Sequence, residues 1–108
     1  MNNVKLIVFL FVFVFSNSFI NAQVNTTEIK TIVIDPGHGG KDSGTMGTKR
    51  FKVYEKHVAL AVSLKLGKYI SENFPEVEVI YTRDSDIFLE LNERTEIANK
   101  SNADLFIS

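Results

Sequence analysis

Hydrophobic residues along the chain form short continuous runs separated by one long helical pattern, which predicts alternating strands and helices. Residues 30–34 (KTIVI) and 77–82 (VEVIYT) are rich in β-branched side chains, as is typical of buried strands. Between them, residues 54–73 place apolar side chains three and four positions apart. This spacing predicts a helix that packs against a sheet through a broad apolar arc. Pro75 ends that helix.

The same alternation continues to the end of the chain. The segment that begins at Leu91 (LNERTEIANK) predicts a second helix, and residues 104–108 predict a third strand. Two consecutive strand–helix–strand units indicate the α/β fold class, with a mainly parallel sheet, flanking helices and right-handed crossovers. Because natural domains seldom end inside a core strand, we expect the chain to be truncated after the third strand.

The first residues follow a different pattern, with an unbroken apolar run at residues 6–15 (LIVFLFVFVF) directly after Lys5. A basic start, an apolar core and a small residue such as Ala22 before a polar segment are typical of a secretory signal peptide. The alternative is a membrane anchor, which needs about 20 apolar residues, and Ser16 interrupts the run much earlier.

We therefore expect residues 1–22 to be a signal peptide and residues 23–29 to be a linker. Residues 30–108 then form the exported domain, without a stable membrane anchor after cleavage. The expected location is the periplasm or cell envelope.

Charge and cysteine content restrict the function further. The chain has 12 basic and 13 acidic residues and a net charge of −1 at pH 7, without the clustered basic residues that indicate nucleic-acid binding. It has no cysteine, so an exported domain must be held together by its core or by a metal instead of disulfides.

The loop after the first strand contains the strongest candidate for chemistry. Residues 35–40 (DPGHGG) break the strand abruptly, and the loop continues to about residue 53. Glycines on both sides of His38 leave space beside an imidazole at the open end of a strand, which suits a zinc ligand or a general base. A turn in a phosphate-binding loop and a plain turn are alternatives, although neither common glycine-rich phosphate motif is present.

Glu55, at the start of the first helix, is the second candidate. The helix macrodipole favours an acid at this position, so a purely structural role is an alternative. The helix start faces back toward the loop, so His38 and Glu55 could share one ion. His57 lies two positions further on, about 200° around the helix, so it should not share an ion with Glu55. We expect it to be a surface residue or a packing residue.

Four more polar residues are candidates for supporting roles. Asp35 can orient a metal-ligating His38 by a hydrogen bond to its ring, or it can hold the turn by hydrogen bonds to the loop backbone. Arg83, Asp86 and Arg94 are expected to brace the second crossover, with substrate contact as the alternative. A catalytic zinc site normally has three protein ligands, so we expect a further ligand beyond residue 108.

Five segments in order give a specific resemblance to a known family. The segments are IDPGHGGKD (34–42), EK with VALAVSLKL (55–66), TRDSD (82–86), LNER with AN (91–99) and ADLFIS (103–108). Together they closely resemble the zinc amidases of the N-acetylmuramoyl-L-alanine amidase family 3 type.

The resemblance implies a three-layer α/β sandwich, of which residues 30–108 are the N-terminal part. It implies one Zn²⁺ ion with His38 and Glu55 as the first two ligands. A histidine just after Ser108 would be the third ligand, and a general-base glutamate would lie further along the chain.

The function implied by this resemblance is hydrolysis of the amide bond between N-acetylmuramic acid and L-alanine in peptidoglycan. By the same reasoning residues 1–108 alone would be inactive. The alternatives are a non-catalytic wall-binding module of the same fold and an exported zinc peptidase that cuts within the stem peptide.

Overall fold

The computed structural model describes residues 28–108 of the protein. The predicted signal peptide (1–22) and most of the predicted linker (23–29) lie outside the described residues. The described part contains, in chain order, β1 (Thr31–Ile34), α2 (Glu55–Asn73), β2 (Glu78–Tyr81), α3 (Leu91–Lys100) and β3 (Leu105–Ile107). Each element lies within a few residues of its predicted position.

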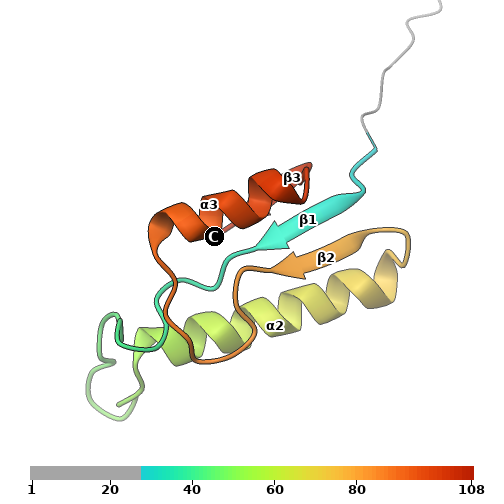
Figure 1. The fold of residues 1–108 in the computed structure, drawn as a ribbon. Coiled ribbons are helices and arrows are strands. Elements are labelled where there is room, and N and C mark those ends of the chain that lie inside the picture. Colours follow the sequence, from blue (N-terminus) through green and yellow to red (C-terminus); the bar gives the residue numbers. More distant parts are fainter. Residues whose placement is uncertain (1–27) are drawn as a thin grey trace, which may run out of the picture.

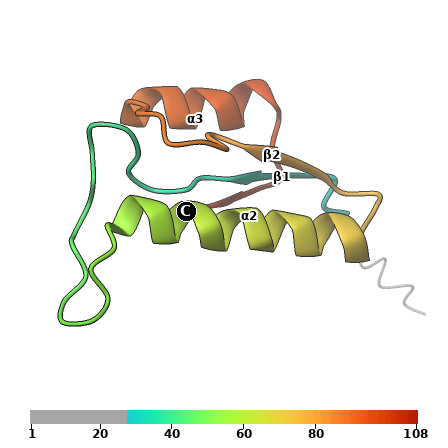
Figure 2. The same ribbon diagram turned by 90° about the horizontal axis from the view of Figure 1, so that it is seen from below.

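The three strands form one parallel sheet in the order β2-β1-β3. The chain steps from β1 to β2 in one direction and then returns across β1 to reach β3. Crossovers of the same hand that run in opposite directions must pass over opposite faces of a sheet. Accordingly, α2 and α3 lie on opposite sides of the sheet, which gives three layers (Figures 1 and 2). The predicted α/β class and layered arrangement are confirmed.

The core is centred on β1, the middle strand. Ile32, Val33 and Ile34 are all buried, as expected for a parallel strand covered on both faces. Ile70 of α2 packs against one side of this strand. The partly buried residues around this cluster come from α2, from β2 and the residue before it, and from β3: Leu66, Val77, Val79, Tyr81 and Ile107.

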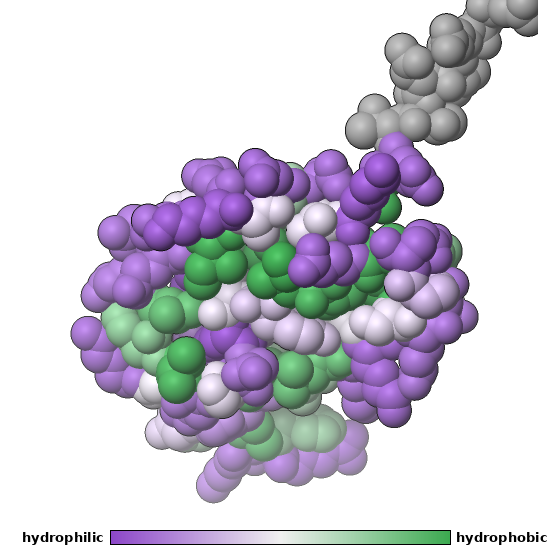
Figure 3. Space-filling view, turned by 45° about the vertical axis from the view of Figure 1, so that its right-hand side comes forward, coloured by the Kyte–Doolittle hydropathy of each residue, from purple (hydrophilic) through white to green (hydrophobic). Residues whose placement is uncertain are grey.

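Only part of the broad apolar arc predicted for α2 packs against the sheet. Val58, Val62 and Tyr69 are 52%, 60% and 62% exposed, whereas the buried residues of the helix are Gly67 and Ile70. The helix is apolar on more than one side, so its pattern alone could not show which side meets the sheet. Figure 3 shows apolar surface across the middle of the face that it views, framed by hydrophilic residues. No helix between residues 28 and 108 combines the length and apolarity needed to cross a membrane.

Candidate metal centre

The loop that follows β1 turns sharply around His38, at the carboxyl edge of the sheet. His38 has a left-handed backbone with φ of 60°, and Gly39 follows with φ of 123°. A Cβ atom on Gly39 would collide with the backbone carbonyl of Ile87, so only glycine fits there. The backbone N–H groups of Gly39 and Asp42 each donate to the other residue's carbonyl oxygen, at 2.8 and 3.0 Å. These bonds close a tight turn directly after the histidine.

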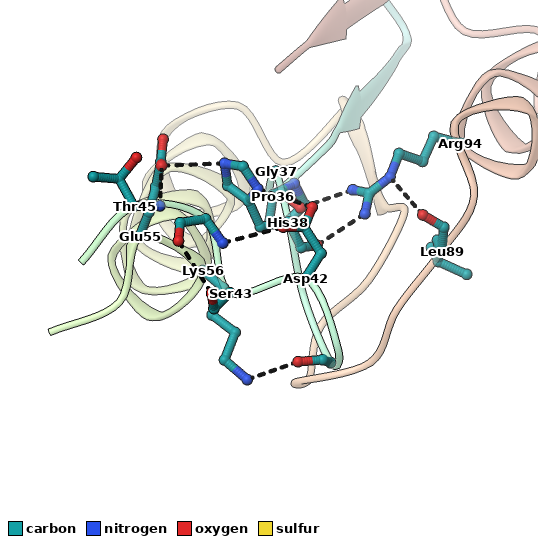
Figure 4. A network of polar contacts seen from close by, with 12 residues as sticks. Pro36, Gly37, His38, Asp42, Ser43, Thr45, Glu55, Lys56, Leu89 and Arg94 are labelled. Atoms are coloured by element: carbon teal, nitrogen blue, oxygen red, sulfur yellow. Dashed lines mark hydrogen bonds and ion pairs between the residues drawn. The ribbon is translucent and has the colours of Figure 1, made fainter.

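The side chains of His38 and Glu55 meet at this edge. Nε2 of His38 lies 3.2 Å from Oε2 of Glu55, the first residue of α2 (Figure 4). The N–H of Thr45 donates to the same carboxylate oxygen at 2.9 Å, and Glu55 N–H donates to Thr45 carbonyl at 2.9 Å. The long loop is therefore tied to the helix start that carries the carboxylate.

The spacing of these two atoms fits a shared metal ion. A nitrogen and an oxygen that each bind zinc at about 2.1 Å in tetrahedral geometry stand about 3.4 Å apart. The 3.2 Å between Nε2 of His38 and Oε2 of Glu55 is close to that value. An imidazole and a carboxylate are also ligand types that zinc accepts.

Asp42 was not singled out from the sequence, although it contacts the histidine directly. Its Oδ2 atom lies 2.9 Å from Nδ1 of His38, and its Oδ1 atom accepts a hydrogen bond from Gly44 N–H at 3.1 Å. The imidazole therefore lies between two carboxylates, one at each ring nitrogen. An acid four residues after a histidine, across a glycine turn, was the signal available in the sequence.

The two carboxylates change the proton affinity of the site. The hydrogen bond to Asp42, and then the negative charges of Asp42 and Glu55, raise the pKa of His38 against a smaller opposing effect of desolvation. The bond to His38 lowers the pKa of Asp42, and the N–H of Thr45 is the main cause of the lowered pKa of Glu55. Without a metal, the site therefore favours a proton on the imidazole, which a bound ion would displace.

Gly44 lets the loop backbone pass directly against the His38–Glu55 pair. Its φ is 61°, and a Cβ atom there would lie 2.8 Å from both Oε2 of Glu55 and Cδ2 of His38. A larger residue would push the two side chains out of place. The sequence analysis did not identify this glycine as part of the site.

Two buried arginines hold the backbone that carries the histidine. Arg83 is 2% exposed and donates to the carbonyl oxygens of Pro36 and Gly37 at 2.9 and 2.7 Å. Arg94 is 5% exposed and donates to the carbonyl oxygens of Pro36 and His38 at 2.9 and 2.8 Å. Every carbonyl of this three-residue turn thus accepts from a guanidinium group.

Asp35 pairs with Arg94 and not with the histidine. Its carboxylate accepts from Arg94 at 2.8 Å, from Thr82 Oγ at 2.6 Å and from Ser108 Oγ at 3.1 Å. Of the two roles considered for Asp35, this geometry supports holding the turn. The contact with His38 Nδ1 comes from Asp42 instead.

Asp86 braces the far side of the same loop. Its carboxylate accepts from Gly40 N–H at 2.8 Å and from Lys56 Nζ at 2.6 Å, and these contacts lower its pKa. Lys56 also donates to the carbonyl oxygen of Gly40 at 3.0 Å. The geometry therefore supports bracing for Arg83, Asp86 and Arg94. Lys56 is a further member of this network that the sequence analysis missed.

Comparison with known proteins agrees with the family resemblance of the sequence motifs. The family profile described as N-acetylmuramoyl-L-alanine amidase (Amidase_3) matches residues 32–108. The chain belongs to this family.

Over the aligned residues, relatives and solved structures of the family are about 40% identical to the chain. A probable N-acetylmuramoyl-L-alanine amidase AmiB of Haemophilus influenzae is 39% identical over 104 residues, which are 96% of this chain and 22% of that protein. N-acetylmuramoyl-L-alanine amidase AmiC of Escherichia coli is 44% identical over 77 residues, 71% of this chain and 18% of that protein. The catalytic domain of the amidase CwlV from Bacillus (Paenibacillus) polymyxa var. colistinus matches with a TM-score of 0.65 at 46% identity, over 72% of this chain and 42% of that one. This family member thus spans about a fifth of those curated relatives.

The His38 side of the site opens into a hollow of about 430 Å³. Its walls are the His38 turn on one side and residues 88–91, which lead into α3, on the other. Within residues 28–108, no group of three or more His, Cys, Asp or Glu side chains could hold a metal ion. His57 is exposed, as expected, and takes no part in the His38–Glu55 contact.

Proposed function

We propose that this family member is a zinc-dependent amidase that hydrolyses the bond between N-acetylmuramic acid and L-alanine in peptidoglycan. Family membership supports the reaction class. The basic start and apolar run of residues 1–22 support export to the periplasm or cell envelope, where peptidoglycan lies. The observation that carries the zinc proposal is the 3.2 Å approach of His38 Nε2 to Glu55 Oε2.

In this proposal His38 and Glu55 are two of the three protein ligands of one Zn²⁺ ion, and the third ligand is a histidine beyond Ser108. Zinc bound there would supply an acidified water and would polarise the scissile carbonyl. A glutamate, also beyond Ser108, would act as the general base that takes up a proton and returns it to the leaving amine.

The residues of the described chain would prepare the site for this reaction. Arg83 and Arg94 fix the carbonyls of the turn, and with them the backbone from which the His38 ring projects toward Glu55. Thr45 fixes the carboxylate of Glu55 at the helix start. Such preorganisation lowers the cost of binding an ion and a substrate in one geometry.

Digestion of purified peptidoglycan with the full-length protein tests the reaction. An amidase releases stem peptides that begin with a free L-alanine amine and leaves the glycan strands intact. Peptides newly cut between two amino acids would indicate a peptidase instead. Binding to peptidoglycan without any release would indicate a wall-binding module.

Substitution of the two proposed ligands tests the zinc site. His38→Ala and Glu55→Gln should each reduce both zinc content and peptide release to near background. His57→Ala is the matched control, because it removes an exposed histidine two residues from Glu55 and should leave both unchanged. Removal of zinc with a chelator should abolish release, and added Zn²⁺ should restore it.

A further inference from the structure

Several hydrogen bonds fix both the backbone and the carboxylate of Asp42 in the loop after β1. Its backbone is paired with Gly39 in both directions, and its Oδ1 atom accepts from Gly44 N–H at 3.1 Å. These contacts leave Oδ2 directed at the imidazole of His38, 2.9 Å from Nδ1. The turn thus fixes Asp42 relative to one nitrogen of the ring.

The two ring nitrogens of His38 have different partners. A neutral imidazole carries one N–H, so one nitrogen donates and the other keeps a lone pair. The contact at Nδ1 is 2.9 Å and the contact at Nε2 is 3.2 Å, so the shorter bond favours the proton on Nδ1. The lone pair of Nε2 then points at the carboxylate of Glu55.

We propose that Asp42 is a positioning residue that holds His38 in the Nδ1–H tautomer, with the Nε2 lone pair turned toward Glu55 to receive a divalent cation. The inference rests on the proposed function, because it assigns Asp42 a role in the same site. A carboxylate behind a ligating histidine fixes the tautomer and makes the imidazole a better donor. A loop role alone would use the backbone and Oδ1 of Asp42 but would give Oδ2 no task.

The test uses two substitutions in the full-length protein. Asp42→Ala removes both acceptor oxygens. In the wild type each of the two donors, His38 and Gly44, has its own carboxylate oxygen, whereas Asp42→Asn leaves one carbonyl oxygen for both. Asp84→Asn is the control, because Asp84 is exposed in the turn after β2 and does not contact His38. Circular dichroism shows whether each variant keeps the fold.

Two readouts are measured that do not depend on hydrolysis. The first is the dissociation constant of Zn²⁺ from competition with a chelating dye. The second is the pair of ¹⁵N chemical shifts of His38 in metal-free protein, at a pH where the ring is neutral, which report the tautomer. Asp42→Ala should weaken zinc binding by about 10- to 100-fold and remove the preference for Nδ1–H, with Asp42→Asn intermediate.

The outcomes separate this inference from the proposed function. A wild-type protein that binds no zinc would overturn the zinc site, while the nitrogen shifts would still test the contact with Asp42. A wild-type protein that binds zinc, together with folded Asp42 variants of equal affinity and unchanged tautomer, would overturn the positioning role and leave the zinc site standing. A change in the Asp84→Asn control as large as that in Asp42→Asn would also overturn it.

Discussion

The guanidinium of Arg94 donates a hydrogen bond of 2.8 Å to the carbonyl oxygen of His38, a residue 56 positions away in the chain. His38 needs this support because its backbone has a φ of 60°, and a left-handed conformation costs a non-glycine residue about 1–2 kcal/mol. The same guanidinium also pairs with the buried carboxylate of Asp35 at 2.8 Å. One side chain from α3 thus stabilises both the strand end and the turn that carries the histidine.

Arg94→Lys should lower the free energy of unfolding by about 1–3 kcal/mol. Lysine keeps the positive charge but lacks the planar fork, so it cannot reach Asp35, Pro36 and His38 together. Urea unfolding monitored by circular dichroism measures the change.

Arg50→Lys is the matched control for this prediction. Arg50 is exposed, and its guanidinium lies over the ring of Phe51, 4.7 Å from the centroid. The same exchange there should change the unfolding free energy by less than about 0.5 kcal/mol. Equal effects of the two substitutions would contradict the role given to Arg94.

Gly44→Ala should destabilise the protein by about 1–2 kcal/mol because its φ is 61°. The added methyl group would also press against His38 and Glu55, since its Cβ would lie 2.8 Å from both side chains. Zinc affinity should therefore fall as well, and both effects are measured on one purified variant, by urea unfolding and dye competition.

Gly37→Ala provides the comparison for Gly44→Ala. A Cβ atom on Gly37 meets no other atom within 4 Å, and its φ is outside the left-handed region. We expect a change of less than about 1 kcal/mol in stability and no loss of zinc affinity. If alanine at position 37 were as harmful as alanine at position 44, steric pressure on the pair would not be the cause.

The contact of α2 with β2 depends on Gly67 having no side chain. A Cβ atom there would overlap the hydroxyl of Tyr81 and lie 2.5 Å from its Cζ atom. Gly67→Ala should therefore cost about 1–3 kcal/mol of stability through overpacking. A Tyr81→Phe background removes the hydroxyl, which makes the closest contact, but keeps the ring, so the same substitution should cost less without becoming neutral. A double-mutant cycle in urea gives the coupling, and strict additivity would be evidence against this contact.

Asp104 should make the protein sensitive to acid. Its carboxylate accepts from the N–H groups of Lys30 and Thr31 at 2.8 and 2.9 Å, and these bonds lower its pKa. A lowered folded-state pKa means that the contribution to stability is complete above the unfolded value of about 3.9. It is lost as the pH falls through the folded-state pKa.

Unfolding free energies between pH 7 and pH 3 test this dependence. Asp104→Asn should reduce the loss of stability at acid pH relative to the wild type, because it removes the titrating group that links the starts of β1 and β3. Asp84→Asn, in an exposed turn away from these strand ends, should leave the acid limb of the profile unchanged.

The sequence by itself determined the secondary structure and the neighbourhood of the site. The β-branched run at residues 31–34 and the breaker cluster after it depend on local preferences, so they placed β1 and its loop correctly. The position of Glu55 at a helix start, with that start facing the loop, was also readable from the pattern, and the structure brings Glu55 to His38. The family motifs gave the same arrangement and the same family.

Only the tertiary structure decided how these parts are fixed. The apolar residues of α2 allow more than one packing face, and the sheet selected the face with Gly67 and Ile70 instead of the one with Val58 and Val62. Apart from the ion pair of Arg94 with Asp35, the partners of Arg83 and Arg94 are backbone carbonyls, which have the same chemistry in every residue and so leave no sequence signal. Spacing and side-chain type report local geometry, whereas these contacts depend on how two crossovers bring distant segments to one edge of the sheet.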